Sequence, residues 1–387
     1  MKMIDGIPVF GDPLDEGALE QIKNAQKRAD KVALMADHHL GFGVPIGGVV
    51  AYKDHVSPNG VGYDIACGNK AVRLDVPAIK VKQKIHVLME EIFKKISFGV
   101  GRANDEKVDH ELFDDPVWSE IPVLKRMKQK AAAQLGTVGS GNHYVDIFID
   151  ELDRVWVGVH FGSRGLGHTI ATEYIEAAQA KGKFEDGIAL LYDRSDAGEE
   201  YLKAMEVAGR YAYAGRDWVC ARVAKILKGD IVEEVHNHHN FCWRENHDSE
   251  DYWVVRKGAT PAFPGQKGFV GGSMGESAVI IEGLEHPEGS FTLRSTVHGA
   301  GRVMSRRAAI GDKKKGLSGR VSERAMMKWM EEAGVVLKGA GVDEAPQCYK
   351  RLPEVLEHHK NTIKVLHTLK PIGVAMAGPD VRDPYKD

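Results

Sequence analysis

The sequence predicts an α+β fold in which the whole chain, residues 1–387, forms a single compact domain. Helical stretches alternate with short β-branched runs such as Val49-Val50, and glycine clusters separate those runs. A length of 387 residues would by itself suggest two or three ordinary domains. No repeat, low-complexity segment or Pro/Gly/Ser-rich linker divides the chain, so we expect one domain.

Apolar residues at helical spacing predict the helices. The first is expected over 14–36, where Leu19, Ile22 and Ala25 lie on one face together with Ala29 and Val32. Further helical stretches are expected over 82–96, 119–135, 168–228, 320–334 and 353–366.

Short β-branched runs between turn residues predict the strands. Residues 40–75 alternate such runs with glycine clusters, which is typical of strands joined by tight loops. The run Arg-Val-Trp-Val-Gly-Val-His over 154–160 predicts a strand that ends on a histidine. Between 230 and 300 short strands return, and they are expected over 252–256, 278–282 and 291–294.

Composition limits the class of protein. The chain carries 52 Lys and Arg against 55 Asp and Glu, so its formal net charge of -3 gives no bulk attraction for nucleic acid, and any such surface must be a local patch. The longest apolar runs fall short of the roughly 20 residues of a membrane span. Four cysteines without a CxxC pair, and no secretion signal, favour reduced thiols in the cytoplasm.

Glycine-rich loops present candidate metal ligands. Asp64 and Cys67 stand three apart in one such loop, and a thiolate can bridge two metals. Other loops present His143, His160 and the run His236-Asn237-His238-His239-Asn240, and neutral imidazoles bind divalent first-row metals. Together these groups would form a site for one or two metals, and ligand softness alone favours zinc or iron. The alternative is that Cys67 is a buried apolar residue and His160 a structural one.

A second group of residues suits phosphate chemistry. His298 begins His-Gly-Ala-Gly-Arg, and a neutral imidazole is a good nucleophile whose phosphoramidate is a good donor. Arg302 and Arg306 follow, and arginines stabilise charge on phosphate. The run Gly-Gly-Ser-Met-Gly over 271–275 could bind phosphate oxygens through its backbone N–H groups and the Ser273 hydroxyl. It does not have the Walker A pattern. The alternative is that these glycines only form tight turns.

A basic run continues beyond these arginines. It comprises Arg307, Lys313, Lys314, Lys315 and Arg320. Such a run is either a solvated loop or the local positive patch that a nucleic-acid substrate requires on a mildly acidic protein.

In this order, the segments resemble the RtcB family of RNA ligases. The resemblance runs from about Asp37 to Gly373, which is most of the chain. The ordered set is specific, although any one motif could arise by chance. The motifs are Asp-His-His-Leu-Gly-Phe-Gly-Val-Pro-Ile-Gly-Gly over 37–48, Val-Gly-Tyr-Asp-Ile-Ala-Cys-Gly over 61–68, Gly-Ser-Gly-Asn-His over 139–143, His-Phe-Gly-Ser-Arg-Gly over 160–165, His-His-Asn over 238–240, Arg-Lys-Gly-Ala over 256–259, Gly-Ser-Met-Gly over 272–275, His-Gly-Ala-Gly-Arg over 298–302 and Asp-Glu-Ala-Pro over 343–346.

The resemblance implies an α+β fold peculiar to this family, with a central cleft that holds two manganese ions. It implies GTP-dependent joining of RNA ends, for repair or for splicing of tRNA halves. One end bears a 2′,3′-cyclic phosphate or 3′-phosphate and the other a 5′-OH. An archease activator is an implied candidate partner. The resemblance therefore implies manganese, although ligand softness alone favours zinc or iron. Metal choice in cells also depends on the geometry of the site and on which metals are available.

The resemblance also assigns roles to residues. His298 matches the histidine that attacks the α-phosphate of GTP, Asp37 matches an acidic site residue, and Cys67 matches the thiolate that bridges the two ions. Asp64 and His143 match the other ligands of one ion, and His160 and His239 match those of the second. Arg302 and Arg306 match residues near the phosphates, Arg306 at the RNA phosphate. The positions that match the nucleotide site are Asn142, Tyr144, Asp146, Asn240, Ser273, Met274, Gly299, Ala300, Gly301, Tyr349 and Met376.

Three positions depart from the family pattern. Asp146 stands where the family usually has Glu, Gly271 replaces a proline, and Met376 replaces a lysine near the guanine. These changes leave two alternatives to the ligase. One is a diverged nucleotidyltransferase that caps phosphate ends with altered nucleotide specificity, and the other is a non-catalytic RNA-binding relative.

Overall fold

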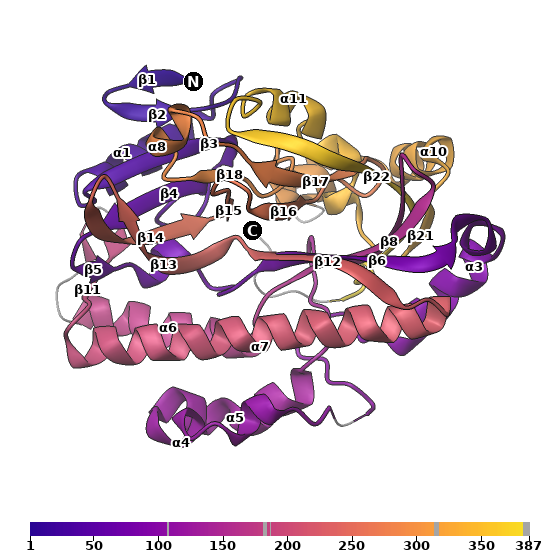
Figure 1. Cartoon of the computed structure of the whole chain (residues 1–387), viewed down its shortest axis with the longest axis horizontal. Coiled ribbons are helices and arrows are strands. Elements are labelled where there is room, and N and C mark those ends of the chain that lie inside the picture. The colour runs from indigo at the N-terminus through magenta and orange to yellow at the C-terminus, as the bar shows by residue number, and fades with distance from the viewer. Residues whose placement is uncertain (107, 181–183, 186, 313–316, 382–387) are drawn as a thin grey trace.

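Two β-sheets form the centre of the molecule (Figure 1). The computed structural model describes residues 1–381 except 107, 181–183, 186 and 313–316. The first sheet has the strand order β1-β2-β3-β4-β14-β13. Its strands are β1 (Lys2–Ile4), β2 (Ile7–Val9), β3 (Lys31–His39), β4 (Ile46–Tyr52), β13 (Asn240–His247) and β14 (Glu250–Lys257).

The larger sheet has the order β12-β6-β8-β7-β22-β17-β16, with β21 parallel to β22. Its other neighbouring strands run antiparallel. Its strands are β6 (Gly68–Pro77), β7 (Tyr144–Asp150), β8 (Arg154–Phe161), β12 (Ile231–His238), β16 (Lys267–Val270), β17 (Ala278–Gly283), β21 (Val336–Lys338) and β22 (Ile363–Met376). Two-stranded pairs complete the β structure: β5 (His55–Val56) with β11 (Leu191–Tyr192), β9 (Phe184–Glu185) with β10 (Ile188–Ala189), β15 (Ala259–Pro261) with β18 (Ser295–Val297), and β19 (Gly311–Asp312) with β20 (Leu317–Ser318).

Helix α7 (Asp196–Leu227) runs beneath both sheets, and α4 (Val117–Glu120) and α5 (Pro122–Gln134) lie beyond it (Figure 1). Ser195 caps the N-terminus of α7 by accepting a hydrogen bond from the Gly198 N–H. The 32 residues of α7 give this helix a length of about 48 Å. Small buried residues such as Ala212 and Gly215 let it approach the sheet closely. The remaining helices are α1 (Glu16–Gln26), α2 (Pro58–Val61), α3 (Ala78–Lys95), α6 (Arg164–Ala180), α8 (Glu288–Phe291), α9 (Arg306–Ile310), α10 (Glu323–Ala333), α11 (Leu352–Glu357) and the 3₁₀ turns Glu111–Asp114, Val342–Glu344 and Pro346–Cys348.

The antiparallel register brings four strand ends to one edge of the larger sheet. Gly68, the first residue of β6, pairs with Phe161 at the end of β8 and with His238 at the end of β12. Tyr144, the first residue of β7, pairs with His160 of β8. Loops that precede or follow these strands therefore meet at this edge. The chain also crosses there from the larger sheet to the smaller one, because β12 ends at His238 and β13 begins at Asn240.

The α+β prediction is confirmed, and most expected elements are present. The helices expected over 82–96, 119–135 and 320–334 correspond to α3, α5 and α10, and the strands expected over 154–160, 252–256 and 278–282 correspond to β8, β14 and β17. The stretch expected to be helical over 168–228 contains α6 and α7, which are separate helices with short strands between them.

Three expectations are wrong in part or in full. Helix α1 ends at Gln26, and Lys31–His39 is the buried strand β3, because an apolar run buried on both faces has no alternation to distinguish it from a helix. Residues 291–294 are not a strand: α8 ends at Phe291, and Leu293 and Arg294 have positive φ before β18. In 353–366 only α11 is helical, and the chain continues as β22, the longest strand in the described part of the chain.

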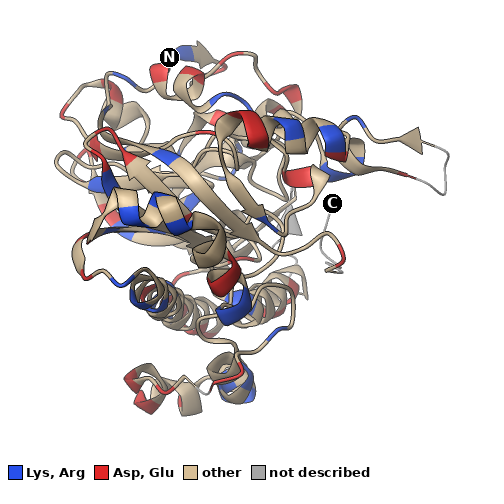
Figure 2. Ribbon diagram, turned by 90° about the vertical axis from the view of Figure 1, so that its right-hand side faces the viewer, with Lys and Arg blue, Asp and Glu red and all other residues tan. Residues whose placement is uncertain are grey.

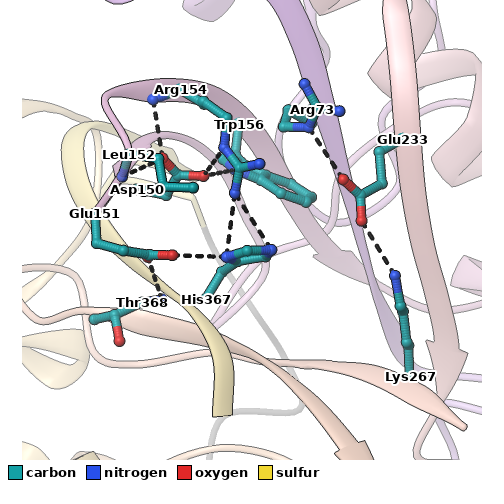
Figure 3. Close-up of polar contacts among 10 residues, drawn as sticks. All are labelled: Arg73, Asp150, Glu151, Leu152, Arg154, Trp156, Glu233, Lys267, His367 and Thr368. Carbon is teal, nitrogen blue, oxygen red and sulfur yellow. Dashed lines mark hydrogen bonds and ion pairs between the residues drawn. The ribbon is translucent and has the colours of Figure 1, made fainter. Parts of the chain in front are cut away.

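A polar network ties the β7–β8 turn to β22 (Figure 3). Trp156 Nε1 and Arg154 Nε both donate to Asp150, at 2.8 and 2.7 Å, while Glu151 accepts from His367 Nδ1 and from the Thr368 N–H. Asp150, Glu151 and His367 lie close enough to resemble a metal site. The Arg154 guanidinium lies between them, 3.1 Å from His367 Nδ1, so the network is a structural clamp for β22.

Charge is mixed over the molecule. Figure 2 shows Lys and Arg interspersed with Asp and Glu along the ribbon, in agreement with the net charge of -3. Lys313, Lys314 and Lys315 of the expected basic patch lie outside the described residues. Among the described residues, none of the helices combines the length and the apolar composition that crossing a bilayer requires.

Candidate metal centre and histidine nucleophile

The strand ends at the edge of the larger sheet place five candidate ligands together. Cys67 Sγ lies 3.2 Å from His160 Nε2 and 3.6 Å from His143 Nε2. His143 Nε2 lies 3.0 Å from Asp64 Oδ2, and His160 Nε2 lies 3.3 Å from His239 Nε2. The chain of contacts therefore runs from Asp64 through His143, Cys67 and His160 to His239. Cys67 is at its middle, where a ligand shared by two ions would have to lie.

Protonation at this cluster favours cation binding. Burial and the neighbouring His143 lower the pKa of His160, and burial and His298 lower the pKa of His239, so both imidazoles are neutral. Although burial acts to raise it, contacts with His143 hold the pKa of Asp64 down at about 2. Burial and Asp64 raise the pKa of the Cys67 thiol. A bound cation reverses that effect, because a coordinating thiol loses its proton.

The tautomers fit a metal as well. His160 Nδ1 donates to the Asn142 carbonyl at 3.1 Å, so its neutral ring presents a lone pair at Nε2. That lone pair faces Cys67 Sγ and His239 Nε2, while His239 Nδ1 has no hydrogen-bond partner among the described residues. A divalent cation among these atoms would satisfy the donor set, which is that of a thiolate, imidazole and carboxylate site.

Close approach at the centre requires a glycine. A Cβ built on Gly162 would lie 2.3 Å from Asp64 Oδ1, too close for any real contact. Gly162 follows β8 directly, so the loop with Asp64 and Cys67 packs against bare backbone at the strand end. Close packing against Asp64 therefore explains why the motif has a glycine at position 162.

His298 lies beside this cluster, and its ring centroid is 4.8 Å from that of His239. Asp37, fully buried in β3, accepts from His298 Nδ1 at 2.6 Å and from the backbone N–H groups of His298 and Gly299 at 2.9 and 3.3 Å. Burial acts to raise the pKa of Asp37, but the contacts with His298 lower it. With its proton held at Nδ1, His298 keeps a lone pair at Nε2 for attack.

The arginines after His298 are held by an acidic turn. Arg302 donates to the Tyr349 hydroxyl at 2.9 Å and to the Asp343 carbonyl at 2.7 Å, and its guanidinium stacks on the Tyr349 ring. Arg306 pairs with Asp343 at 3.1 Å and with Glu344. Contacts with the segment 343–349 therefore hold both cations at fixed positions.

The candidate nucleotide residues gather from several loops. Gly271 and Gly299 form an isolated β-bridge, so the Ser273 loop lies beside the glycines that follow His298. Ser273 Oγ donates to Glu276 at 3.0 Å. The side-chain carbonyl of Asn240, the residue after His239, accepts from the Gly258 N–H at 2.7 Å. This hydrogen bond ties Gly258 to the loop around His239. Ala300 and Gly301 follow Gly299 in the chain, and Asn142 precedes the candidate ligand His143.

A buried wall of side chains from β7, β22 and the Ser273 loop lies next to these loops. Tyr144 and Met376 are paired across β7 and β22 and belong to one buried cluster with Met274. The Tyr144 hydroxyl and one oxygen of Asp146 are buried and have no hydrogen-bond partner among the described residues. Burial raises the pKa of Asp146 well above its usual range. The wall therefore combines apolar surface with two unsatisfied polar groups.

The structure brings together the candidate ligands Asp64, Cys67, His143, His160 and His239, and within the run 236–240 it is His239 that joins them. His236 lies away from the other ligands and accepts from Arg216 Nε at 2.7 Å. Two cations were missed. Lys350 donates to the Ala36 and His38 carbonyls around Asp37, and Arg216 lies fully buried behind Cys67. Neither stands in a motif, so no sequence signal marked them.

The site combines candidate metal ligands with a candidate histidine nucleophile, which are the groups that a metal-dependent nucleotidyl-transfer enzyme would require. The family model described as tRNA-splicing ligase RtcB matches residues 18–121 and 117–377. The chain therefore belongs to the RtcB family.

Curated relatives match over nearly the whole length. The chain is 32% identical to the RNA-splicing ligase RtcB of Escherichia coli (strain K12), with 94% of each chain covered. It is 30% identical to the tRNA-splicing ligase RtcB of Thermococcus kodakarensis, over 88% of this chain and 86% of that one. The tRNA-splicing ligase RtcB of Nanoarchaeum equitans is also 30% identical, over 93% of this chain and 91% of its own.

Proposed function

We propose that this protein is an RNA ligase that joins a 3′-phosphate or 2′,3′-cyclic phosphate end to a 5′-OH end, with GTP and two Mn²⁺ ions. Family membership and the names of the relatives support the ligase reaction. The observation that carries the proposal is the position of His298, hydrogen-bonded to Asp37 through Nδ1 and packed beside the metal-ligand cluster.

In the proposed reaction, His298 Nε2 attacks the α-phosphorus of GTP. A P–N bond forms, the bond to the β-phosphate oxygen breaks, and pyrophosphate leaves. An oxygen of the RNA 3′-phosphate then attacks the same phosphorus, so that His298 leaves and the GMP is carried by the RNA end. The 5′-OH attacks the RNA phosphorus, forms the new phosphodiester and releases GMP. A cyclic end is first opened by water.

Each candidate ligand has a place in this proposal. Asp64, Cys67 and His143 would hold one ion, and Cys67, His160 and His239 the other, which matches the order of contacts along the cluster. When bound, such ions neutralise phosphate charge. Asp37 fixes the His298 tautomer, and Arg302 stabilises charge on phosphate near it.

The nucleotide is proposed to lie between the Ser273 loop and the glycines after His298. Backbone N–H groups of Gly299, Ala300 and Gly301 suit its phosphates. Tyr144, Met274 and Met376 form the wall proposed for the base, with Asp146 behind it. Asn142, Asn240 and Tyr349 are the remaining proposed contacts. Arg306 is proposed for the RNA phosphate, which would compete with Asp343 and Glu344 for its guanidinium.

The partners follow from this reaction. RNA with the stated ends is the proposed substrate, tRNA halves included, and an archease is the proposed activator. The four cysteines are free in the structure, which supports the cytoplasm as the proposed compartment.

One observation favours a second candidate, a nucleotidyltransferase with altered base specificity. The wall proposed for the base has Met376 where the family pattern has a lysine, and burial raises the pKa of its carboxyl at Asp146, so the residues named for this wall supply no cation. A panel of α-labelled nucleoside triphosphates separates the two candidates. Only the RNA ligase requires that the protein prefer GTP and then join the two RNA ends.

The test is covalent labelling. Purified protein is incubated with α-labelled GTP and Mn²⁺ and run on a denaturing gel beside His298→Ala. The matched control is His367→Ala, which removes a histidine with its own carboxylate partner far from the centre. We expect an acid-labile, alkali-stable label in wild type and in the control, and none in His298→Ala. No label in folded, metal-bound wild type contradicts the GTP-dependent mechanism.

A further inference from the structure

Arg216 is a buried cation in α7 without a carboxylate partner. Its side chain is 0% exposed, and no carboxylate of the described residues lies within ion-pair distance of its guanidinium. A charge in this position is costly unless hydrogen bonds compensate it. The guanidinium donates instead to four neutral acceptors: Ala66 O at 3.0 Å, Phe161 O at 2.5 Å, His236 Nε2 at 2.7 Å and His238 Nδ1 at 2.9 Å.

Those acceptors stand next to the candidate metal ligands. Ala66 precedes Cys67, Phe161 follows His160, and His238 precedes His239. A single atom, Nη1, bonds both carbonyls and so links the Cys67 loop to the end of β8. One side chain therefore joins the Cys67 loop to the ends of β8 and β12, which carry His160 and precede His239.

The peptide at Ala66 is strained, which makes its hydrogen bonds informative. Ala66 has φ 60, a left-handed conformation that costs energy for any residue with a Cβ. Its N–H donates to the Asn240 carbonyl at 2.7 Å, and its carbonyl accepts from Arg216. Strained backbone persists only where surrounding contacts hold it. This conformation turns the next residue, Cys67, toward His143 and His160.

The two histidines act as acceptors for Arg216. Arg216 Nε donates to His236 Nε2 and Arg216 Nη2 to His238 Nδ1, so each ring presents a lone pair to the guanidinium at that nitrogen. Tyr213 stacks on His238, with ring centroids 4.0 Å apart, and holds that ring in place. Asp217 lies 3.5 Å from His236 Nδ1, and Lys70 pairs with Asp217 and Glu234 at the outer side of the network.

We propose that Arg216 is a positioning residue for the metal centre, which preorganises the Cys67 loop and the ends of β8 and β12 for metal binding. This inference rests on the proposed function, because it takes Cys67, His160 and His239 as ligands. Residues that orient metal ligands typically contribute 10–100-fold to metal affinity. Arg216 differs from an ordinary helix–sheet contact because its bonds end on the ligand-bearing segments.

The test measures metal binding directly. Metal-free wild type, Arg216→Lys and Arg216→Met are titrated with Mn²⁺ in a calorimeter, and with Co²⁺ while the thiolate-to-metal absorption band is recorded. We expect affinity to fall about 10–100-fold in Arg216→Met and less in Arg216→Lys, with a weakened or shifted Co²⁺ band. The matched control is Tyr211→Phe, which removes a buried hydrogen bond from the same helix to Ala131, away from the centre, and should bind like wild type.

The outcomes separate the two proposals. Wild type that binds neither ion overturns the metal-dependent function and this inference with it. Wild-type affinity and an unchanged Co²⁺ band in both folded Arg216 variants overturn only the role of Arg216. If those variants do not fold, His236→Phe removes one acceptor and leaves both carbonyl contacts. A several-fold fall in its Mn²⁺ affinity supports the inference, and unchanged affinity overturns it.

Discussion

At the residue scale, the contact between Asp37 and His298 has the clearest chemical consequence. The Asp37 carboxylate accepts three N–H groups, one from the imidazole and two from the backbone. It therefore decides which ring nitrogen carries the proton and where the ring points. Sequence analysis named both residues, but their contact spans 261 positions and comes from the tertiary structure.

Asp37→Asn tests this contact. An amide can donate to His298 Nδ1 and so favours the wrong tautomer, with the proton on Nε2. We expect the rate of covalent labelling by GTP to fall by up to about 10⁴-fold, the size of the effect that the same change has in a serine-protease triad. The control is Glu151→Gln, which alters the carboxylate contact of His367 (Figure 3) and should leave the rate unchanged.

Two carboxyl groups of β7 should affect the pH dependence of the free energy of unfolding in opposite directions. Burial raises the pKa of Asp146, so the folded state binds more protons than the unfolded one above pH ~3.8, and stability is lost as pH rises through that window. Burial also acts to raise the pKa of Asp150, but hydrogen bonds from Trp156 and Arg154 lower it, so its contribution is lost as pH falls.

Asparagine substitutions separate these effects. Relative to wild type, Asp146→Asn should raise the Tm, with a difference that grows from pH 4 to pH 8. Asp150→Asn should lower the Tm, with a difference that shrinks toward acid pH. Thermal unfolding followed by circular dichroism from about pH 2.5 to pH 8 measures both, because the Asp150 effect is lost below the ordinary carboxyl pKa of about 3.9. A gain for Asp146→Asn that is constant with pH would contradict burial of an ionisable carboxyl.

At the element scale, the centre depends on where strands end. The β6, β7, β8 and β12 ends meet at one edge because the strands are antiparallel and in register. The sequence predicted the β8 strand and its terminal histidine, since Val-Trp-Val-Gly-Val is a strong β run. It could not predict β3, which is buried on both faces, or β22, whose first half is partly exposed without strict alternation and whose last four residues are all buried.

Gly162→Ala tests the close approach at the end of β8. The added Cβ would lie 2.3 Å from Asp64 Oδ1, so either the loop or the carboxylate must shift. We expect Mn²⁺ affinity to fall by about tenfold or more, while the protein stays folded because the loop is at the edge of the sheet. The control is Gly378→Ala, where a Cβ meets no atom within 4 Å, and calorimetric titration compares the two.

At the scale of the whole molecule, metal binding should couple to stability. The candidate ligands join four strand ends and the crossing between the two sheets. A ligand at 100 times its Kd stabilises the folded state by about 2.7 kcal/mol. We expect a chelator to lower the Tm and added Mn²⁺ to restore it, with both effects much reduced in Cys67→Ser. Cys242→Ser, at a buried cysteine of β13, should retain the Mn²⁺ effect.

The sequence by itself determined the α+β class, the glycine-rich loops and the identity of the candidate ligands and nucleophile. These are local properties: a loop motif keeps its residues together whatever the rest of the chain does. Only the tertiary structure decided that Asp64, Cys67, His143, His160 and His239 form one chain of contacts with His298 beside it. It alone also revealed Arg216, because a buried cation in a helix is recognised by its acceptors, and two of these, Phe161 and Ala66, are 55 and 150 residues away in the chain.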